Sequence, residues 1–343
     1  MLMAMPSHAD AFEVLCLQAA DSGRGEVLFG PSLARARKLA RPFMVGEKFP
    51  SVYLEFPLIG KQFLDVTILY GNLASGTRIA SEAATGSEAM IDWFSDILKT
   101  DKSYTDISCG FELDTKESEL PLAAIHFQPR THKDLIVPFC TVLGEEHRGK
   151  LCLDFAKRAP EIWPLSYFGF FRGRPGSPLR VCGYMRHSQI DACSQDPHQL
   201  AKAFDEIGFT AYNDQMLAQT SALIATNPQG VDFQFDIYED GHLGPTFAID
   251  LQFGIERPEQ VAASFQDGLA ARVFGLLEAQ GSADGRWRLV GKAAFARSVN
   301  VQLEDGSTGR YAFTLMPQWV KARWHEGIQQ PSKLYHYANA GLL

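Results

Sequence analysis

Apolar residues alternate with other residues in five paired stretches, which recur at intervals of roughly sixty residues. The clearest pair covers 231–237 and 247–255, where every second residue is Val, Phe, Ile or Leu. This period is typical of strands, and turn residues such as Asp240 and Gly241 between the two stretches favour a hairpin. The predicted hairpins span 51–71, 107–127, 163–186 and 231–255, and the last pairs 318–326 with 332–338.

Helical periodicity fills most of the intervals between these hairpins. The segment 87–98, for example, places Met90, Ile91 and Phe94 on one face. The other predicted helices cover 132–144, 149–158, 198–208, 214–225 and 258–280. The segments 299–303 and 311–315 are expected to form a short ribbon, and the pattern does not indicate where this ribbon lies relative to the barrel.

Ten antiparallel strands with one apolar face each predict an α+β fold, since helices would cover that face. We expect a closed ten-stranded barrel surrounded by helices, because closure removes exposed strand edges. The expected domain is single and covers 1–343. A long open sheet and two smaller α+β domains are the alternatives.

The opposite face of the strands is unusually polar. If the apolar face points outward, so many charges inside require a wide, water-accessible chamber, since burying unpaired ions is costly. A ten-stranded barrel is wide enough for one. The inward set comprises Tyr53, Glu55, Asp65, Thr67, Glu112, His126, Gln128, Arg180, Cys182, Tyr184, Arg186, Asp232, Gln234, Asp236, Tyr238, Asp250, Gln252, Lys321, Arg323, Lys333, Tyr335 and Tyr337.

Composition removes several classes of protein. The net charge of −8 argues against a nucleic-acid binder, and no apolar run reaches the length of a membrane span. Asp10 and Glu13 do not fit a signal peptide, so we expect a cytoplasmic protein with no membrane partner. The six cysteines lack metal-ligand spacing and are expected to be free thiols, without a structural metal.

Several segments resemble the ABBA prenyltransferases, whose αββα unit repeats around a ten-stranded barrel. Residues 52–56 (Val-Tyr-Leu-Glu-Phe) resemble the strand where the family often keeps a substrate-binding Glu. Residues 110–114 and 124–127 are similar to the second hairpin of its peptide-modifying, cyanobactin-type members. The indole-modifying members carry a basic residue followed by tyrosines two and four positions later, a pattern that 333–337 resembles and 180–184 keeps in part.

This resemblance implies prenyl transfer from dimethylallyl or geranyl diphosphate to a peptide side chain or an aromatic natural product. Basic residues would stabilise the leaving diphosphate, and tyrosine faces would hold the allylic cation. The implied diphosphate ligands are Arg180, Lys321, Arg323 and Lys333. The implied shields are Tyr184, Tyr335 and Tyr337, with Tyr53 and Tyr238 as further substrate-binding candidates.

Carboxylates and one histidine complete the candidate site. Glu55 would orient or deprotonate the acceptor, and His126 is the second catalytic candidate. Asp232, Asp236 and Asp250 could hold Mg²⁺ beside the diphosphate, or attract a cationic acceptor such as a guanidinium or an amine. Gln128 and Thr67 depart from the family pattern, since peptide-modifying members tend to place Arg at the position of Gln128.

Other interpretations stay open. A non-catalytic barrel that binds a peptide or a cationic small molecule is the main alternative, and a hydrolase using Glu and His ranks last because no nucleophile motif accompanies them. The segment 172–176 is expected to be an exposed turn. The sequence gives no indication of the oligomeric state.

Overall fold

The computed structural model describes residues 3–21, 25–101, 103–104, 106–115, 122–158 and 164–343. Its strands are β1 Met3–Ala4, β2 Ser51–Pro57, β3 Asp65–Tyr70, β4 Ser108–Leu113, β5 Ala124–Gln128, β6 Leu165–Phe170, β7 Leu179–Tyr184, β8 Gly230–Ile237, β9 Leu243–Gln252, β10 Phe295–Gln302, β11 Thr308–His325 and β12 Ile328–Leu342. Its helices are α1 His8–Asp21, α2 Gly25–Phe29, α3 Ser32–Ala40, α4 Glu88–Thr100, α5 Ile136–Val142, α6 Glu146–Arg158, α7 His187–Gln195, α8 Pro197–Ile207, α9 Asp214–Ile224, α10 Pro258–Gln266, α11 Leu269–Ala279 and α12 Trp287–Ala293. Short 3₁₀ turns lie at Arg41–Phe43, Glu82–Ala84 and Lys133–Leu135.

Ten of these strands close into the predicted antiparallel barrel. Their order is β11-β12-β2-β3-β4-β5-β6-β7-β8-β9, and β9 pairs back onto β11. In the closing register Lys321 lies opposite Asp250, and Trp319 lies opposite Gln252. Because each side chain alternates between the two faces of its strand, this register fixes which residues share the lumen.

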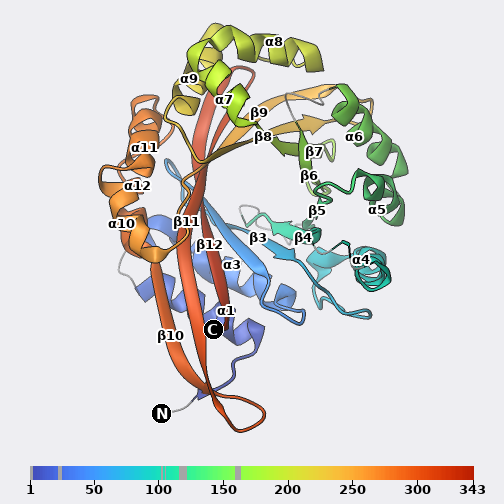
Figure 1. Ribbon diagram of the computed structural model, residues 1–343, viewed down its shortest axis with the longest axis vertical. Helices are drawn as coiled ribbons and strands as arrows, with labels where there is room; N and C mark the ends of the chain where they lie inside the picture. Colours follow the sequence, from blue (N-terminus) through green and yellow to red (C-terminus); the bar gives the residue numbers. More distant parts are fainter. Residues whose placement is uncertain (1–2, 22–24, 102, 105, 116–121, 159–163) are drawn as a thin grey trace.

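Strand β11 belongs to two structures at once. Its second half, from Trp319 to His325, pairs with β9 and closes the barrel. Its first half pairs with β10 in the register Phe295↔Leu315 to Gln302↔Thr308, and β1 adds a short parallel strand to β10. This ribbon projects from one end of the barrel (Figure 1). The short ribbon expected from the sequence is therefore an extension of the last hairpin, whose strands are longer than predicted.

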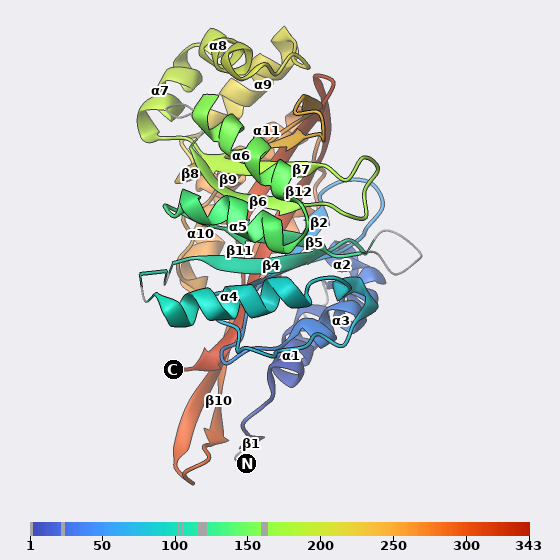
Figure 2. The ribbon, with the colours of Figure 1, turned by 90° about the vertical axis from the view of Figure 1, so that its right-hand side faces the viewer.

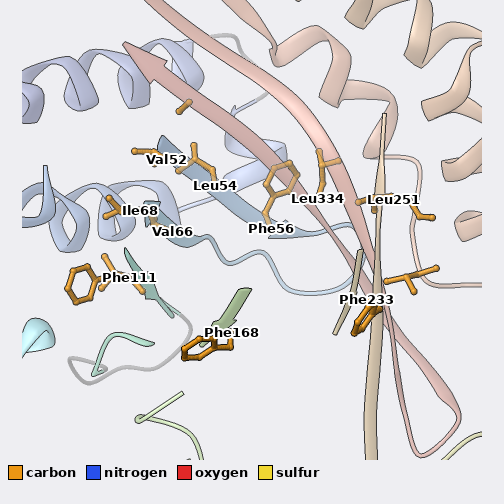
Figure 3. Close-up of a cluster of buried hydrophobic side chains, with 14 of the residues drawn as sticks. Val52, Leu54, Phe56, Val66, Ile68, Phe111, Phe168, Phe233, Leu251 and Leu334 are labelled. Atoms are coloured by element: carbon orange, nitrogen blue, oxygen red, sulfur yellow. The ribbon is translucent and has the colours of Figure 1, made fainter. Parts of the chain in front are cut away.

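The apolar faces of the strands point outward, as predicted, and form a layer between the barrel and the helices. Val52, Leu54 and Phe56 of β2 are at most 1% exposed. Figure 3 shows such side chains on β2, β3, β4, β6, β8, β9 and β12. Figure 2 shows α4, α5 and α6 along the outer side of β4 to β7. The main hydrophobic core is thus a ring around the strands, which leaves the barrel centre free for polar groups.

The predicted single helix over 258–280 is wrong, because the structure divides it. The segment 258–280 forms two helices, α10 and α11, because the backbone turns at Asp267 and Gly268. A Cβ on Gly268 would lie 2.7 Å from the Ser264 Cα, so glycine permits this close turn. The buried residues Val261, Phe265 and Val273 still face the sheet layer. Within the described residues, no helix has the length and apolar character needed to cross a bilayer.

Candidate active site

The lumen contains two neighbouring cavities. The larger has a volume of about 800 Å³ and the smaller about 20 Å³, room for roughly one water. Four side chains line both cavities and separate them: Glu112, Arg180, Gln234 and Lys321. A volume of 800 Å³ lies in the range of small-molecule sites, so the larger cavity is the candidate substrate chamber.

An aromatic wall runs along one side of the larger cavity. The ring centroids of Tyr53 and Trp319 are 4.8 Å apart, and those of Trp319 and Tyr335 are 5.2 Å apart. At the end of the wall, Lys321 Nζ donates a hydrogen bond to the Tyr335 hydroxyl and lies 4.8 Å from its ring centroid. Aromatic faces attract cations, and here they adjoin a lysine that can bind an anion.

The smaller cavity is basic. Its lining holds five basic residues against three carboxylates, which leaves an excess of two positive charges if all are ionised. Those side chains are Arg174, Arg180, Lys321, Arg323 and Lys333, with Glu55, Glu112 and Asp236. Among the described residues Arg323 has no ion pair, and burial together with the nearby Arg180 lowers its pKa. The positive potential at this end favours a bound anion.

Lys333 sits between two buried carboxylates. Its Nζ is 2.8 Å from Glu55 Oε1 and 3.0 Å from Asp65 Oδ2. Burial opposes ionisation of Glu55, but the ammonium groups of Lys333 and Lys321 lower its pKa to about 2. Burial, with the Glu55 charge, raises the pKa of Asp65 to about 7. The pair of carboxylates therefore carries between one and two charges near neutral pH, with Lys333 as the counter-ion.

Arg180 and Arg174 are also paired. Arg180 makes two hydrogen bonds to Asp236, from Nε at 2.8 Å and from one terminal nitrogen at 3.1 Å. Arg174 donates to Glu112 at 3.1 Å, and both guanidinium groups stack on Phe171 at 4.0 and 4.3 Å. The segment 172–176 is a turn with Gly173, Pro175 and Gly176 exposed, as expected, but its Arg174 reaches from the β6–β7 loop to the smaller cavity.

His126 faces the larger cavity and is held by Glu112. Its Nε2 lies 3.2 Å from Glu112 Oε2. Burial opposes ionisation of Glu112, but the His126 hydrogen bond and the Arg174 charge hold its pKa well below the ordinary value. On the other side, a Cβ on Gly169 would lie 2.6 Å from His126 Nδ1, so only glycine leaves room for the ring here.

Asp232 and Asp250 are cross-strand partners on β8 and β9, and both line the larger cavity. Gln252 donates to Asp232 Oδ2 at 3.1 Å, and Gln234 donates to Asp250 Oδ2 at 2.6 Å. Burial raises the pKa of Asp232 to about 6 and that of Asp250 to about 7. Asp250 Oδ1 is buried without a hydrogen-bond partner among the described residues.

The lumen brings together most of the predicted site residues. Tyr53, His126, Arg180, Tyr184, Asp232, Asp250, Lys321 and Tyr335 line the larger cavity, while Glu55, Asp236, Arg323 and Lys333 line only the smaller one. The predicted acidic patch is therefore wrong as a unit, because Asp236 faces a different cavity from Asp232 and Asp250. No group of three potential metal ligands occurs within the described residues, which does not support the Mg²⁺ site.

Two predicted tyrosines line neither cavity. Tyr337 packs on Tyr53 with ring centroids 5.3 Å apart, and Tyr238 stacks on His242 in the β8–β9 turn at 4.9 Å. Tyr238 lies beyond the end of β8, where strand alternation no longer directs side chains inward.

The cavity residues that were not predicted include four with large polar or aromatic side chains: Arg130, Tyr167, Arg174 and Trp319. Trp319 lies two residues before Lys321 on the same strand, so its side chain leaves the same face as those of Lys321 and Arg323. The alternation that predicted these two lumen residues therefore also predicts Trp319. Tyr167 follows a strand irregularity between Leu165 and Tyr167, and Arg174 comes from a loop. Neither signal can be read from alternation.

The closed ten-stranded barrel, its helical jacket and its polar lumen define the class of αββα barrels. Several solved structures match the chain over nearly its whole length, including the following three. The 5-dimethylallyltryptophan synthase from Streptomyces coelicolor is 10% identical, covers 95% of each chain and has a TM-score of 0.51. The prenyltransferase PriB in its apo form is 8% identical over 98% of this chain and 96% of its own, with a TM-score of 0.50.

The NotF prenyltransferase is 9% identical, over 96% of this chain and 92% of its own, with a TM-score of 0.50. No protein-family model matches the sequence, and no curated protein matches it either. At these identities the likeness concerns the fold. The chain has the fold of the ABBA prenyltransferases, as its resemblance to that family predicted.

Proposed function

We propose that the protein transfers a prenyl group from an allylic diphosphate to an acceptor in the larger cavity. The observation that carries this proposal is the direct contact between Lys321 and the aromatic wall at Tyr335. It places a lysine that can bind an anion next to aromatic faces that stabilise a carbocation. Cleavage of an allylic diphosphate produces both an anion, the diphosphate, and an allylic cation in one step. The three prenyltransferases with this fold support the same chemistry.

The diphosphate would bind at the floor of the larger cavity, because the smaller cavity is too small to hold it. Lys321 has one hydrogen bond to Tyr335, and an ammonium group has three donors, so two remain for phosphate oxygens. Arg180 keeps donors that its pairing with Asp236 does not use. Arg323 and Lys333, with Arg174, would raise the positive potential behind this floor.

In the transfer step, the bond between C1 of the prenyl chain and the diphosphate oxygen breaks, and its electron pair leaves with the diphosphate. Electrons of the acceptor form the new bond to C1, and the acceptor then loses a proton. Tyr53, Trp319 and Tyr335 would line the path of the allylic cation and exclude water from it. Tyr184 is 52% exposed and would lie at the cavity mouth.

His126 is the better of the two candidate bases. It lines the larger cavity, and Glu112 holds its Nε2, which would orient the ring and stabilise the protonated form. Glu55 lines the smaller cavity, is 3% exposed and is tied to Lys333. We therefore assign Glu55 a positioning role on Lys333 and Tyr335, in place of proton abstraction.

Calorimetry with dimethylallyl and geranyl diphosphate tests the donor site, and their consumption with a panel of peptides, indoles and phenols tests the reaction. Arg323→Met is the most informative variant, because Arg323 has no ion pair among the described residues and its loss strands no carboxylate there. We expect diphosphate binding to weaken about three- to tenfold, because Arg323 would act on the diphosphate through its charge and not through a direct hydrogen bond. Lys202→Met, on the exposed face of α8, is the control. Absence of binding and turnover with every donor would refute the proposal.

One observation favours a second candidate, a non-catalytic barrel. Lys333, Arg180 and Arg174 already have carboxylate partners, so their charges are largely neutralised within the protein. Such a barrel would bind a peptide or a cationic small molecule without consuming any diphosphate. The donor assay above distinguishes the two candidates.

A further inference from the structure

We infer that Asp232 and Asp250 form a subsite for a cationic nitrogen group, a guanidinium or a primary ammonium, in the larger cavity. The two residues are Cα partners on adjacent antiparallel strands, so their side chains leave the sheet on the same face. Calling the bound group part of the prenyl acceptor rests on the proposed function. The cation site itself does not.

The first argument is an unused acceptor atom. Asp250 is 3% exposed, yet its Oδ1 has no hydrogen-bond partner among the described residues, although the residue lines the cavity. Buried carboxylate oxygens are rarely left without donors, because desolvation is then uncompensated. A ligand that donates N–H bonds from the cavity would supply the missing partner.

The second argument is that the protein holds the other oxygens in place. Gln234 and Gln252 each use an amide group to fix Oδ2 of Asp250 and of Asp232. Gln234 also donates to the Tyr167 hydroxyl at 3.1 Å, which ties it to β6. Both carboxyl groups are therefore oriented by neutral donors, and neither forms an ion pair among the described residues, although the charges of Arg130 and Lys321 act on Asp232 and Asp250.

The alternative ligand, a divalent metal, fits less well. Asp236 is two residues from Gln234 but points into the smaller cavity and is paired with Arg180. In the described part of the chain no third His, Cys, Asp or Glu joins these two carboxylates, which makes a poor metal site, whereas two carboxylates match the several N–H donors of one guanidinium or ammonium group.

The ionisation of Asp250 gives the subsite a pH signature. Burial and the neighbouring Asp232 and Glu55 raise the pKa of Asp250 to about 7, and Lys321 and Arg180 oppose this rise. The titratable groups around it are Asp232 on β8, Lys321 on β11, Arg180 and Cys182 on β7, Tyr167 on β6, Glu55 on β2 and Tyr335 on β12.

A cation binds the ionised carboxylate, so the affinity of the subsite for a cation must rise with pH. With a pKa of about 7, the ionised fraction grows from about 3% at pH 5.5 to about 90% at pH 8, a change of ~30-fold.

Calorimetry without any prenyl donor tests the inference. The probes are Nα-acetylarginine methylamide, Nα-acetyllysine methylamide and the neutral citrulline analogue. We expect at least one cationic probe to bind at pH 8, about 30-fold more weakly at pH 5.5, and the citrulline probe to bind much more weakly. Asp250→Asn should weaken binding about 10- to 100-fold, while Asp267→Asn, an exposed control, should not.

If Asp250→Asn fails to fold, Asp232→Asn provides the same test. Equal binding of the arginine and citrulline probes, no binding of either cationic probe at pH 8, or saturable Mg²⁺ binding that Asp250→Asn removes would overturn the inference. Binding of the arginine probe without binding or turnover of dimethylallyl or geranyl diphosphate would keep the cation site and refute prenyl transfer. Turnover with uncharged acceptors and no cation binding would do the reverse.

Discussion

Replacing Lys333 by Met removes the counter-ion of two buried carboxylates, Glu55 and Asp65. These side chains are 3% and 1% exposed, and Lys333 Nζ lies 2.8 and 3.0 Å from them. Removing one partner of a buried ion pair typically costs about 3–5 kcal/mol, because the remaining charge stays buried. We expect Lys333→Met to lower the free energy of unfolding by about 4 kcal/mol at pH 7.5, measured by urea denaturation followed by circular dichroism.

The pH dependence of this loss separates an electrostatic cause from poor packing. Without Lys333 the folded-state pKa of both carboxyl groups rises above its unfolded value. The variant then loses stability as pH rises through the unfolded value of about 4, so its deficit should be smaller at pH 5 than at pH 7.5. Adding Glu55→Gln and Asp65→Asn should restore most of the lost stability at pH 7.5. A deficit below about 1 kcal/mol, or one that is constant from pH 5 to 7.5, would contradict the buried cluster described here.

Three further predictions concern other buried groups. Burial lowers the pKa of His336 from 6.5 to about 3, so the fold loses stability as pH falls below 6.5, at up to about 1.4 kcal/mol per pH unit. Urea denaturation should therefore show that His336→Leu gains about 3 kcal/mol relative to the parent between pH 7.5 and 4.5, and an equal difference at both pH values would exclude this cause. Gly169→Ala should destabilise by about 1–3 kcal/mol, because its Cβ would lie 2.6 Å from His126 Nδ1, and His126→Ala should suppress most of that loss in a double-mutant cycle. All six cysteines are free and buried, so a thiol reagent should label them only after denaturation. Rapid labelling of the native protein would contradict their burial.

Strand alternation predicted the ten strands, and the apolar parity of 231–237 and 247–251 identified their outward face. Closure was favoured because it removes exposed strand edges and because the opposite face is unusually polar, while alternation alone left an open sheet as an alternative. The sequence could not predict where β11 changes partners, since residues 311–315 and 318–326 carry the same period although one pairs with β10 and the other with β9. That choice depends on the bulge between Pro317 and Trp319, which is a tertiary feature.

The sequence predicted which residues face the lumen, but not which charged side chains contact one another there. Parity placed Lys333, Arg180 and Asp236 inside the barrel. It could not show that Lys333 of β12 binds both Glu55 of β2 and Asp65 of β3. Nor could it show that Arg174, from a loop, neutralises Glu112. Charge pairing across a lumen depends on side-chain reach and on shear of the closed sheet, and neither is encoded locally.

The annular hydrophobic layer separates the part of the molecule that maintains the fold from the part that recognises small molecules. Substitutions at lumen positions such as Tyr167, Gln234 and Gln252 leave the contacts between strands and helices intact, so chemical selectivity can change while the scaffold persists. The ion cluster around Lys333 is the exception, because there a polar interior position also carries part of the folding free energy.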